Sequence, residues 1–80
     1  MSEYLKQFKI QLLSKVQGVK FQDKSAIETA IVREGQVVAM IKDEKDYVTV
    51  NIGGNVYKYD KWYTKPEHLA EALKVYLERK

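Results

Sequence analysis

Aromatic and lysine side chains gather in one short stretch of the chain, between residues 56 and 65. A tryptophan and a tyrosine stand side by side there, among several lysines. Exposed aromatic rings stack on unpaired bases and nearby lysines neutralise phosphates, so this combination is typical of surfaces that bind single-stranded nucleic acid. The sequence therefore predicts a nucleic-acid-binding site made of Lys58, Lys61, Trp62, Tyr63 and Lys65. The alternative is that these rings belong to the core side of a strand and its end.

Side chains that catalyse reactions or bind metals are sparse. The chain has no cysteine and a single histidine, His68, which shares H-x-x-E spacing with Glu71. One histidine and one carboxylate are fewer ligands than a zinc site needs. Asp43, Glu44 and Asp46 crowd one turn, but they lack the spaced ligands and the turn glycine of an EF-hand loop. We therefore expect a protein that is not an enzyme and that carries neither a metal nor another cofactor.

Length and composition narrow the class of protein. The 80 residues suit one domain, 1–80, with 45% apolar and 31% charged residues. No apolar run approaches the roughly 18 residues of a membrane-spanning helix, so no membrane contact is expected. The absence of cysteine favours a cytoplasmic location. The net charge of +3 arises from twelve lysines and two arginines. Such a balance allows weak attraction to phosphates but few of the forked contacts that read base edges.

An amphipathic helix is predicted at each end of the chain. Between residues 2 and 17 the apolar side chains fall on one arc of a helical wheel, and Gly18 is suited to end this helix. The second helix is predicted to begin near Thr64. Thr64 and Glu67 have capping-box spacing there, and Pro66 lies in the first turn.

The segment between the helices has the pattern of antiparallel strands. Residues 36–42 and 47–52 are predicted strands, and a glycine turn at 53–54 leads into a third at 56–60. Residues 25–34 have a capping-box spacing that favours a helix but are rich in β-branched residues, so strand is the preferred interpretation. Residues 19–22 suit a short edge strand. The predicted fold is α+β, a four- or five-stranded antiparallel meander flanked by the two helices, both on one face.

The glycine turn also predicts which side chains share a face. A loop of two residues pairs even-numbered positions with odd-numbered ones. Tyr57 and Tyr59 should therefore be buried beside Val48, Val50 and Ile52, while Lys58 faces water.

The hairpin at 26–42 is apolar on both of its predicted faces. Strict alternation groups Ile31 with Val38, and it leaves a second apolar set on the opposite face. With both helices on one side of the sheet, that set would form an exposed patch of the kind that marks an interface. The predicted interface is Val32, Val37, Ala39 and Ile41.

The alternative for that hairpin is one helix on each side, which would make both faces core. Two functions of different class therefore stay open. One is a small, regulatory protein that binds single-stranded nucleic acid. The other is a protein-interaction module or inhibitor, acting as a homodimer or on another protein.

Overall fold

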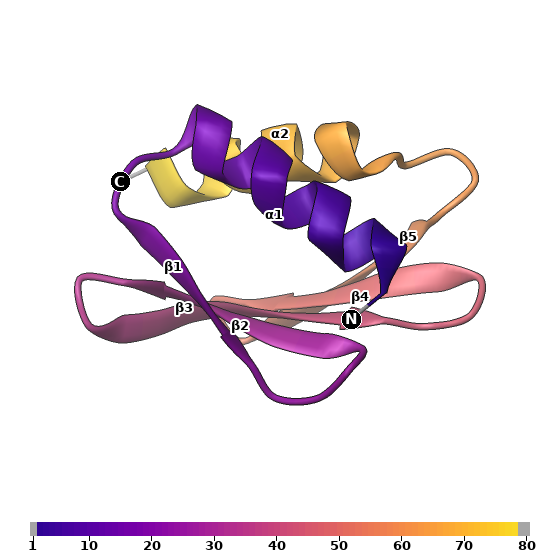
Figure 1. Cartoon of the computed structure of the whole chain (residues 1–80), viewed down its shortest axis with the longest axis horizontal. Helices are drawn as coiled ribbons and strands as arrows, with labels where there is room; N and C mark the ends of the chain where they lie inside the picture. Colours follow the sequence, from indigo (N-terminus) through magenta and orange to yellow (C-terminus); the bar gives the residue numbers. More distant parts are fainter. Residues whose placement is uncertain (1, 79–80) are drawn as a thin grey trace.

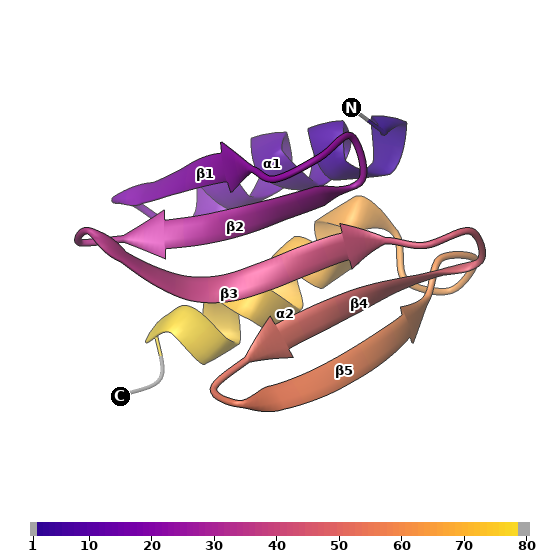
Figure 2. The ribbon, with the colours of Figure 1, turned by 90° about the horizontal axis from the view of Figure 1, so that it is seen from below.

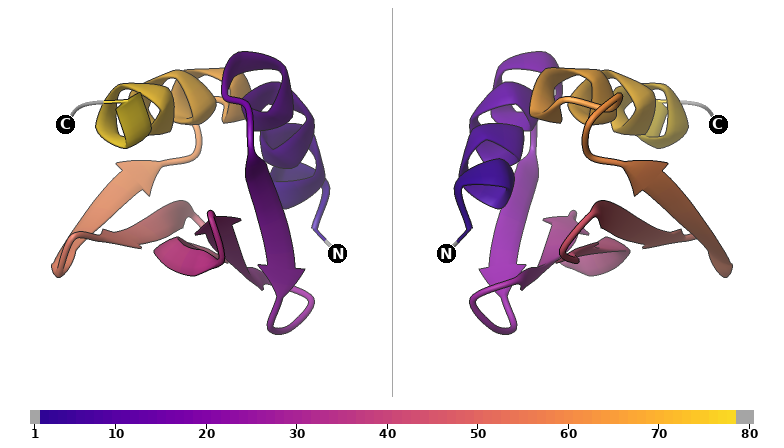
Figure 3. Two further views of the ribbon diagram at one scale, coloured as in Figure 1. Left: turned by 90° about the vertical axis from the view of Figure 1, so that its left-hand side faces the viewer. Right: turned by 90° about the vertical axis from the view of Figure 1, so that its right-hand side faces the viewer.

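The computed structural model describes residues 2–78, which form one layer of helices on one layer of sheet (Figure 1). Both helices lie on the same face of the sheet and pack against each other (Figure 3). Five antiparallel strands are paired in sequence order, which confirms the predicted α+β meander. The elements are α1 (Glu3–Lys15), β1 (Val19–Asp23), β2 (Glu28–Arg33), β3 (Gln36–Asp43), β4 (Tyr47–Ile52), β5 (Asn55–Asp60) and α2 (Pro66–Glu78). Neither of these two helices is long and apolar enough to cross a membrane.

Helix α1 begins and ends where its sequence provides caps. The hydroxyl of Ser2 accepts a hydrogen bond from the N–H of Leu5 at 3.1 Å, which satisfies one of the free donors of the first turn. The helix ends at Lys15, and Gly18, with φ of 80°, turns the chain into β1. Its buried stripe, which faces the sheet and α2, consists of Leu5, Phe8 and Leu12.

The N-cap of helix α2 lies one residue later than predicted. The carbonyl of Lys65 accepts from the N–H groups of His68 and Leu69, so Lys65 occupies the N-cap position and Pro66 the first helical position. Thr64 lies in the preceding loop instead. The side chains that α2 buries against the sheet and α1 are Leu69, Ala70, Leu73 and Leu77.

A β-bulge in the β2–β3 hairpin decides which residues of β3 face the helices. Regular pairing would set Ile31 opposite Val38, but Ile31 pairs with Ala39 instead. The extra residue reverses the alternation, so Ala39 and Ile41 point into the core, where they are 2% and 0% exposed. The prediction that these two form an exposed interface was wrong, because it assumed unbroken alternation along β3.

The β4–β5 hairpin has the predicted register. Val48 pairs with Tyr59 and Val50 with Tyr57, so both tyrosines face the helix layer. They are half-buried rather than buried, because they lie on the edge strand. Tyr59 packs against the core, and the ring of Tyr57 lies 5.6 Å from that of Tyr76 on α2.

Candidate functional site

The aromatic loop, residues 61–65, joins β5 to α2 at one end of the sheet. Trp62 is 77% exposed and Tyr63 is 85% exposed. Neither ring contributes to the hydrophobic core, which excludes a core role for the single tryptophan. Two neighbouring aromatic side chains therefore project from one turn, with Lys65 exposed beside them.

Lys61 fixes the start of the aromatic loop from inside. Its ammonium lies 2.5 Å from a carboxylate oxygen of the buried Asp43 and donates to the carbonyl of Glu44 at 3.1 Å. The same ammonium lies 5.5 Å from the ring centroid of Tyr4. The charge of Lys61 is thus used within the protein. Its predicted role as a phosphate ligand does not fit this geometry, since the side chain turns inward toward an acidic partner.

Tyr4 and Asp60 fix the rest of the loop. The carboxylate of Asp60 accepts from the N–H of Trp62 at 2.7 Å, and its carbonyl accepts from the N–H of Thr64 at 2.8 Å. The hydroxyl of Tyr4 donates to the carbonyl of Thr64 at 2.6 Å. Burial, with the nearby charges of Asp43 and Glu67, raises the pKa of Tyr4 and keeps its hydroxyl protonated as a donor. These contacts therefore hold the backbone of the loop at Trp62 and Thr64, from which the two aromatic side chains project.

The open face of the sheet adjoins the aromatic loop. Figure 2 looks onto this face, which neither helix covers. Lys42, Thr49 and Lys58 lie directly opposite one another in a row across β3, β4 and β5. The ammonium of Lys58 lies 4.5 Å from the ring centroid of Tyr47, at the start of β4. This row places two lysines and a hydroxyl near the loop.

Three lysines of this surface form no ion pair within the described residues. Within residues 2–78, no carboxylate lies within 4.0 Å of the side-chain nitrogen of Lys42, Lys58 or Lys65. The three ion pairs found there instead involve Lys9, Lys15 and Lys61. Lys42, Lys58 and Lys65 thus keep their charge available to a ligand, whereas Lys61 does not.

A shallow hollow of about 210 Å³ lies beside this row on the open face. It combines apolar, amide, hydroxyl and charged groups, and it is lined by Glu28, Met40, Lys42, Thr49, Asn51 and Val56. Lys42, Thr49 and Asn51 are not among the site residues predicted from the sequence. The pairing of the strands could have identified them. Thr49 lies opposite Lys42 on one side and Lys58 on the other, and Asn51 lies opposite Val56.

The predicted apolar interface is reduced to one cross-strand pair of valines, Val32 and Val37. With Ala39 and Ile41 in the core, Val32 remains half-buried and Val37 is 54% exposed near the β2–β3 turn. Val56, 63% exposed, lies on β5 and is separated from them by Asn51 and Met40. The open face is therefore mixed in polarity.

The other predicted chemistry stays dispersed. His68 is exposed, and Glu71 makes an ion pair with Lys15 at 3.3 Å. Among the described residues, no three histidine, cysteine or acidic side chains gather in a way that could hold a metal ion.

Comparison with known protein families, with characterised proteins and with solved structures found no match for this chain. Its function is therefore inferred from its own geometry.

Proposed function

We propose that this protein binds single-stranded nucleic acid through the aromatic loop and the adjoining row of the open sheet face. The observation that supports this most directly is the pair of exposed rings, Trp62 and Tyr63, on a loop fixed by an ion pair and hydrogen bonds. A loop whose backbone is already held loses little backbone conformational entropy on binding. Stacking a base on such a ring contributes about 1–3 kcal/mol.

The lysines around the rings suit the phosphate backbone. Lys65 follows the rings, and Lys58 and Lys42 extend the positive charge over the open face. Each phosphate that they neutralise releases counterions. The logarithm of the binding constant therefore falls with the logarithm of the salt concentration, with a slope of about 0.7 per phosphate for single strands. Lysine lacks the planar fork that reads base edges, so little sequence preference is expected. Thr49 and Asn51 add groups that hydrogen bond sugars or bases.

A protein partner is the second candidate, and one observation favours it. The acidic side chains of Asp46 and Asp60 are exposed next to the aromatic loop and weaken its attraction for phosphates. Tryptophan and tyrosine are enriched among the residues that dominate protein interfaces. In this case Trp62 and Tyr63 insert into a pocket of the partner. A second copy of the chain is a different candidate partner, which would meet the open face at Val37 or Val56 instead of the aromatic loop.

The experiment is a titration of the 80-residue protein with short DNA and RNA oligonucleotides, followed by tryptophan fluorescence. Since Trp62 is the single tryptophan, its emission reports on the loop directly. We expect quenching on binding and an affinity that falls as salt is raised. Replacing both Lys42 and Lys58 with alanine should lower the salt dependence. The matched control is Lys6→Ala, which removes an exposed lysine on α1 and should change neither the affinity nor its salt dependence.

Unchanged emission with both oligonucleotides at low salt would contradict nucleic-acid binding and favour a protein partner. Light scattering after size-exclusion chromatography then separates the remaining cases. A mass of two chains that falls to one in a Val37→Lys or Val56→Lys variant identifies self-association through the open face.

A further inference from the structure

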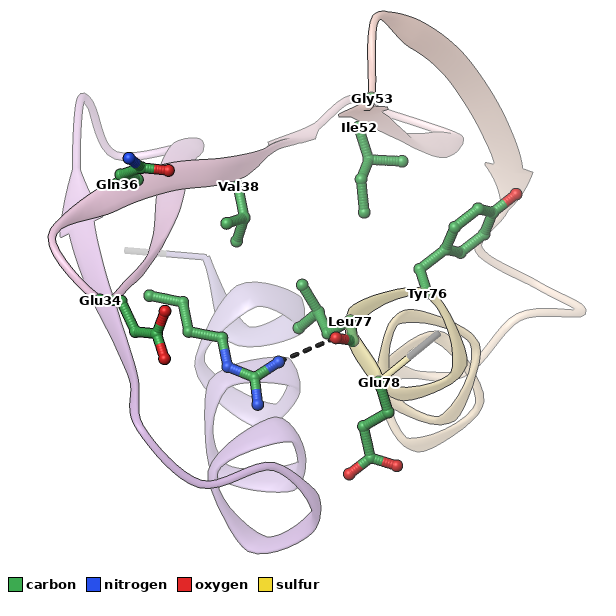
Figure 4. A pocket seen from close by; sticks show the side chains of 9 residues that line it. Glu34, Gln36, Val38, Ile52, Gly53, Tyr76, Leu77 and Glu78 are labelled. Carbon is green, nitrogen blue, oxygen red and sulfur yellow. Dashed lines mark hydrogen bonds between the residues drawn. The ribbon is translucent and has the colours of Figure 1, made fainter. Parts of the chain in front are cut away.

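A cavity of about 540 Å³ separates the last turn of α2 from the sheet (Figure 4). Ile52 and Gly53 line it, so it lies at the end of β4 opposite the aromatic loop. Cavities of about 300–1,000 Å³ are typical of sites for small molecules. This cavity is therefore large enough for a ligand, and it is separate from the proposed nucleic-acid surface.

One wall of the cavity is apolar. Val38 and Ile52 point into it from the sheet, and Leu77 from α2, with Tyr76 beside them (Figure 4). Val38 is the residue that the β-bulge leaves without a partner in the β2–β3 register. The bulge that turns Ala39 into the core thus also forms this wall.

The opposite wall carries a positive charge. The guanidinium of Arg33, which also lines the cavity, donates one hydrogen bond to the carbonyl of Leu77 at 2.9 Å and so links the end of β2 to the last turn of α2. In the part of the chain that the structure describes, no carboxylate lies within 4.0 Å of this guanidinium. Its other N–H groups are available to an anionic group of a ligand.

The lining of the cavity also carries negative charge. Glu34 and Glu78 also line the cavity, and both are exposed. A simple anion would meet two carboxylates, and a simple cation would meet Arg33. A molecule with both charges and an apolar side chain matches the apolar, the positive and the negative groups of the lining.

We infer that the cavity binds a small zwitterion with a large apolar side chain, that is, a free aliphatic or aromatic amino acid. Its carboxylate contacts Arg33, and its ammonium lies toward Glu34 and Glu78. The side chain packs against Val38, Ile52 and Leu77.

Three compounds with the same ring test this inference. L-Phenylalanine carries both charges, 3-phenylpropanoate lacks the ammonium and 2-phenylethylamine lacks the carboxylate. Titrations followed by amide chemical shifts in NMR should show L-phenylalanine perturbing the β2–β3 turn and the last turn of α2. Each analogue should bind about tenfold more weakly or worse, because a charged group loses its partner. Equal binding of the three compounds, or no response to L-phenylalanine and L-leucine at millimolar concentration, would overturn the inference.

Variants at exposed positions locate the charges without disturbing the core. Glu34→Gln combined with Glu78→Gln should weaken L-phenylalanine binding and leave 3-phenylpropanoate binding unchanged or tighter. The matched control is Glu67→Gln, at the other end of α2, which should change the binding of neither compound. A loss of binding to both compounds in the control as well would argue against the assigned site. Trp62→Ala should retain L-phenylalanine binding in full, so this result does not depend on the nucleic-acid proposal.

Discussion

The two ends of the β4–β5 hairpin differ in how the helix layer meets the sheet. At the aromatic loop, the charged side chains of Lys61 and Asp43 meet, and Tyr4 reaches across to the carbonyl of Thr64. At the other end, a cavity of about 540 Å³ remains between α2 and the sheet. The same two layers thus provide a tightly connected end and an unfilled one.

This difference separates two kinds of binding surface. A protruding aromatic pair is effective only when the backbone beneath it is fixed, and polar contacts across three elements achieve that here. A small-molecule site instead needs space within the layers, and the core loses packing contacts to provide it. The proposals for the two ends therefore predict different responses to the same types of substitution.

The largest effect is expected from Lys61→Met. The substitution leaves the buried carboxylate of Asp43 without its cation, and breaking such a pair costs about 3–5 kcal/mol. Chemical denaturation should show this loss in the free energy of unfolding. Lys65→Met, on the exposed side of the same loop, should change it by less than about 0.5 kcal/mol. Similar losses for both variants would show that the Lys61–Asp43 pair does not close this end.

A matched pair of valine substitutions tests the packing of the two ends. Val48→Ile adds a methylene where the side chain is fully buried, and overpacking should lower stability by about 1–3 kcal/mol. Val38→Ile directs the same methylene into the cavity and should raise stability by up to about 0.8 kcal/mol. Thermal or chemical unfolding measures both. A destabilised Val38→Ile protein would mean that the cavity is not open to a side chain.

Much of the fold could be predicted because local signals agree with it. The helices follow from apolar spacing, and the β4–β5 register follows from the turn at Gly53 and Gly54, both of which have positive φ. The bulge between Ile31 and Val32 could not be predicted in this way. No glycine or proline marks it, and it is favoured by the burial of Ala39 and Ile41, which is a tertiary effect.

The candidate site was only partly predictable for the same reason. Trp62, Tyr63 and Lys65 were found because exposed aromatic and basic residues adjoin in the sequence. Lys61 belongs to the same aromatic and basic stretch, but the direction of its side chain is set by its ion pair with Asp43 of β3. The cavity could not be foreseen, because Arg33 and Leu77 meet only after both layers have packed.

Tyr4→Phe is expected to have a smaller effect on the connected end. It removes the hydrogen bond to Thr64, which contributes about 0.5–1.5 kcal/mol at neutral pH. The pKa of Tyr4 is raised in the folded protein, so its stabilising contribution is complete below the unfolded pKa of about 10 and is lost as pH rises further. The variant should therefore show a flatter decline of stability above about pH 10. A decline of unchanged steepness would contradict this assignment. Some decline should remain, because Tyr57 and Tyr59 also have raised pKa values.

The smallest effect on stability is expected from Trp62→Ala. The side chain is 77% exposed, and surface substitutions of this kind usually change the free energy of unfolding by less than about 0.5 kcal/mol. Oligonucleotide affinity, measured by fluorescence anisotropy of a labelled strand, should nevertheless fall by about 1–3 kcal/mol for the lost stacking. Phe8→Ala provides the opposite case, because its ring is fully buried and its removal should cost about 3–5 kcal/mol of stability. A Trp62→Ala protein that loses stability as Phe8→Ala does would place the ring in the packed structure, and the aromatic loop would then be a structural closure rather than a binding surface.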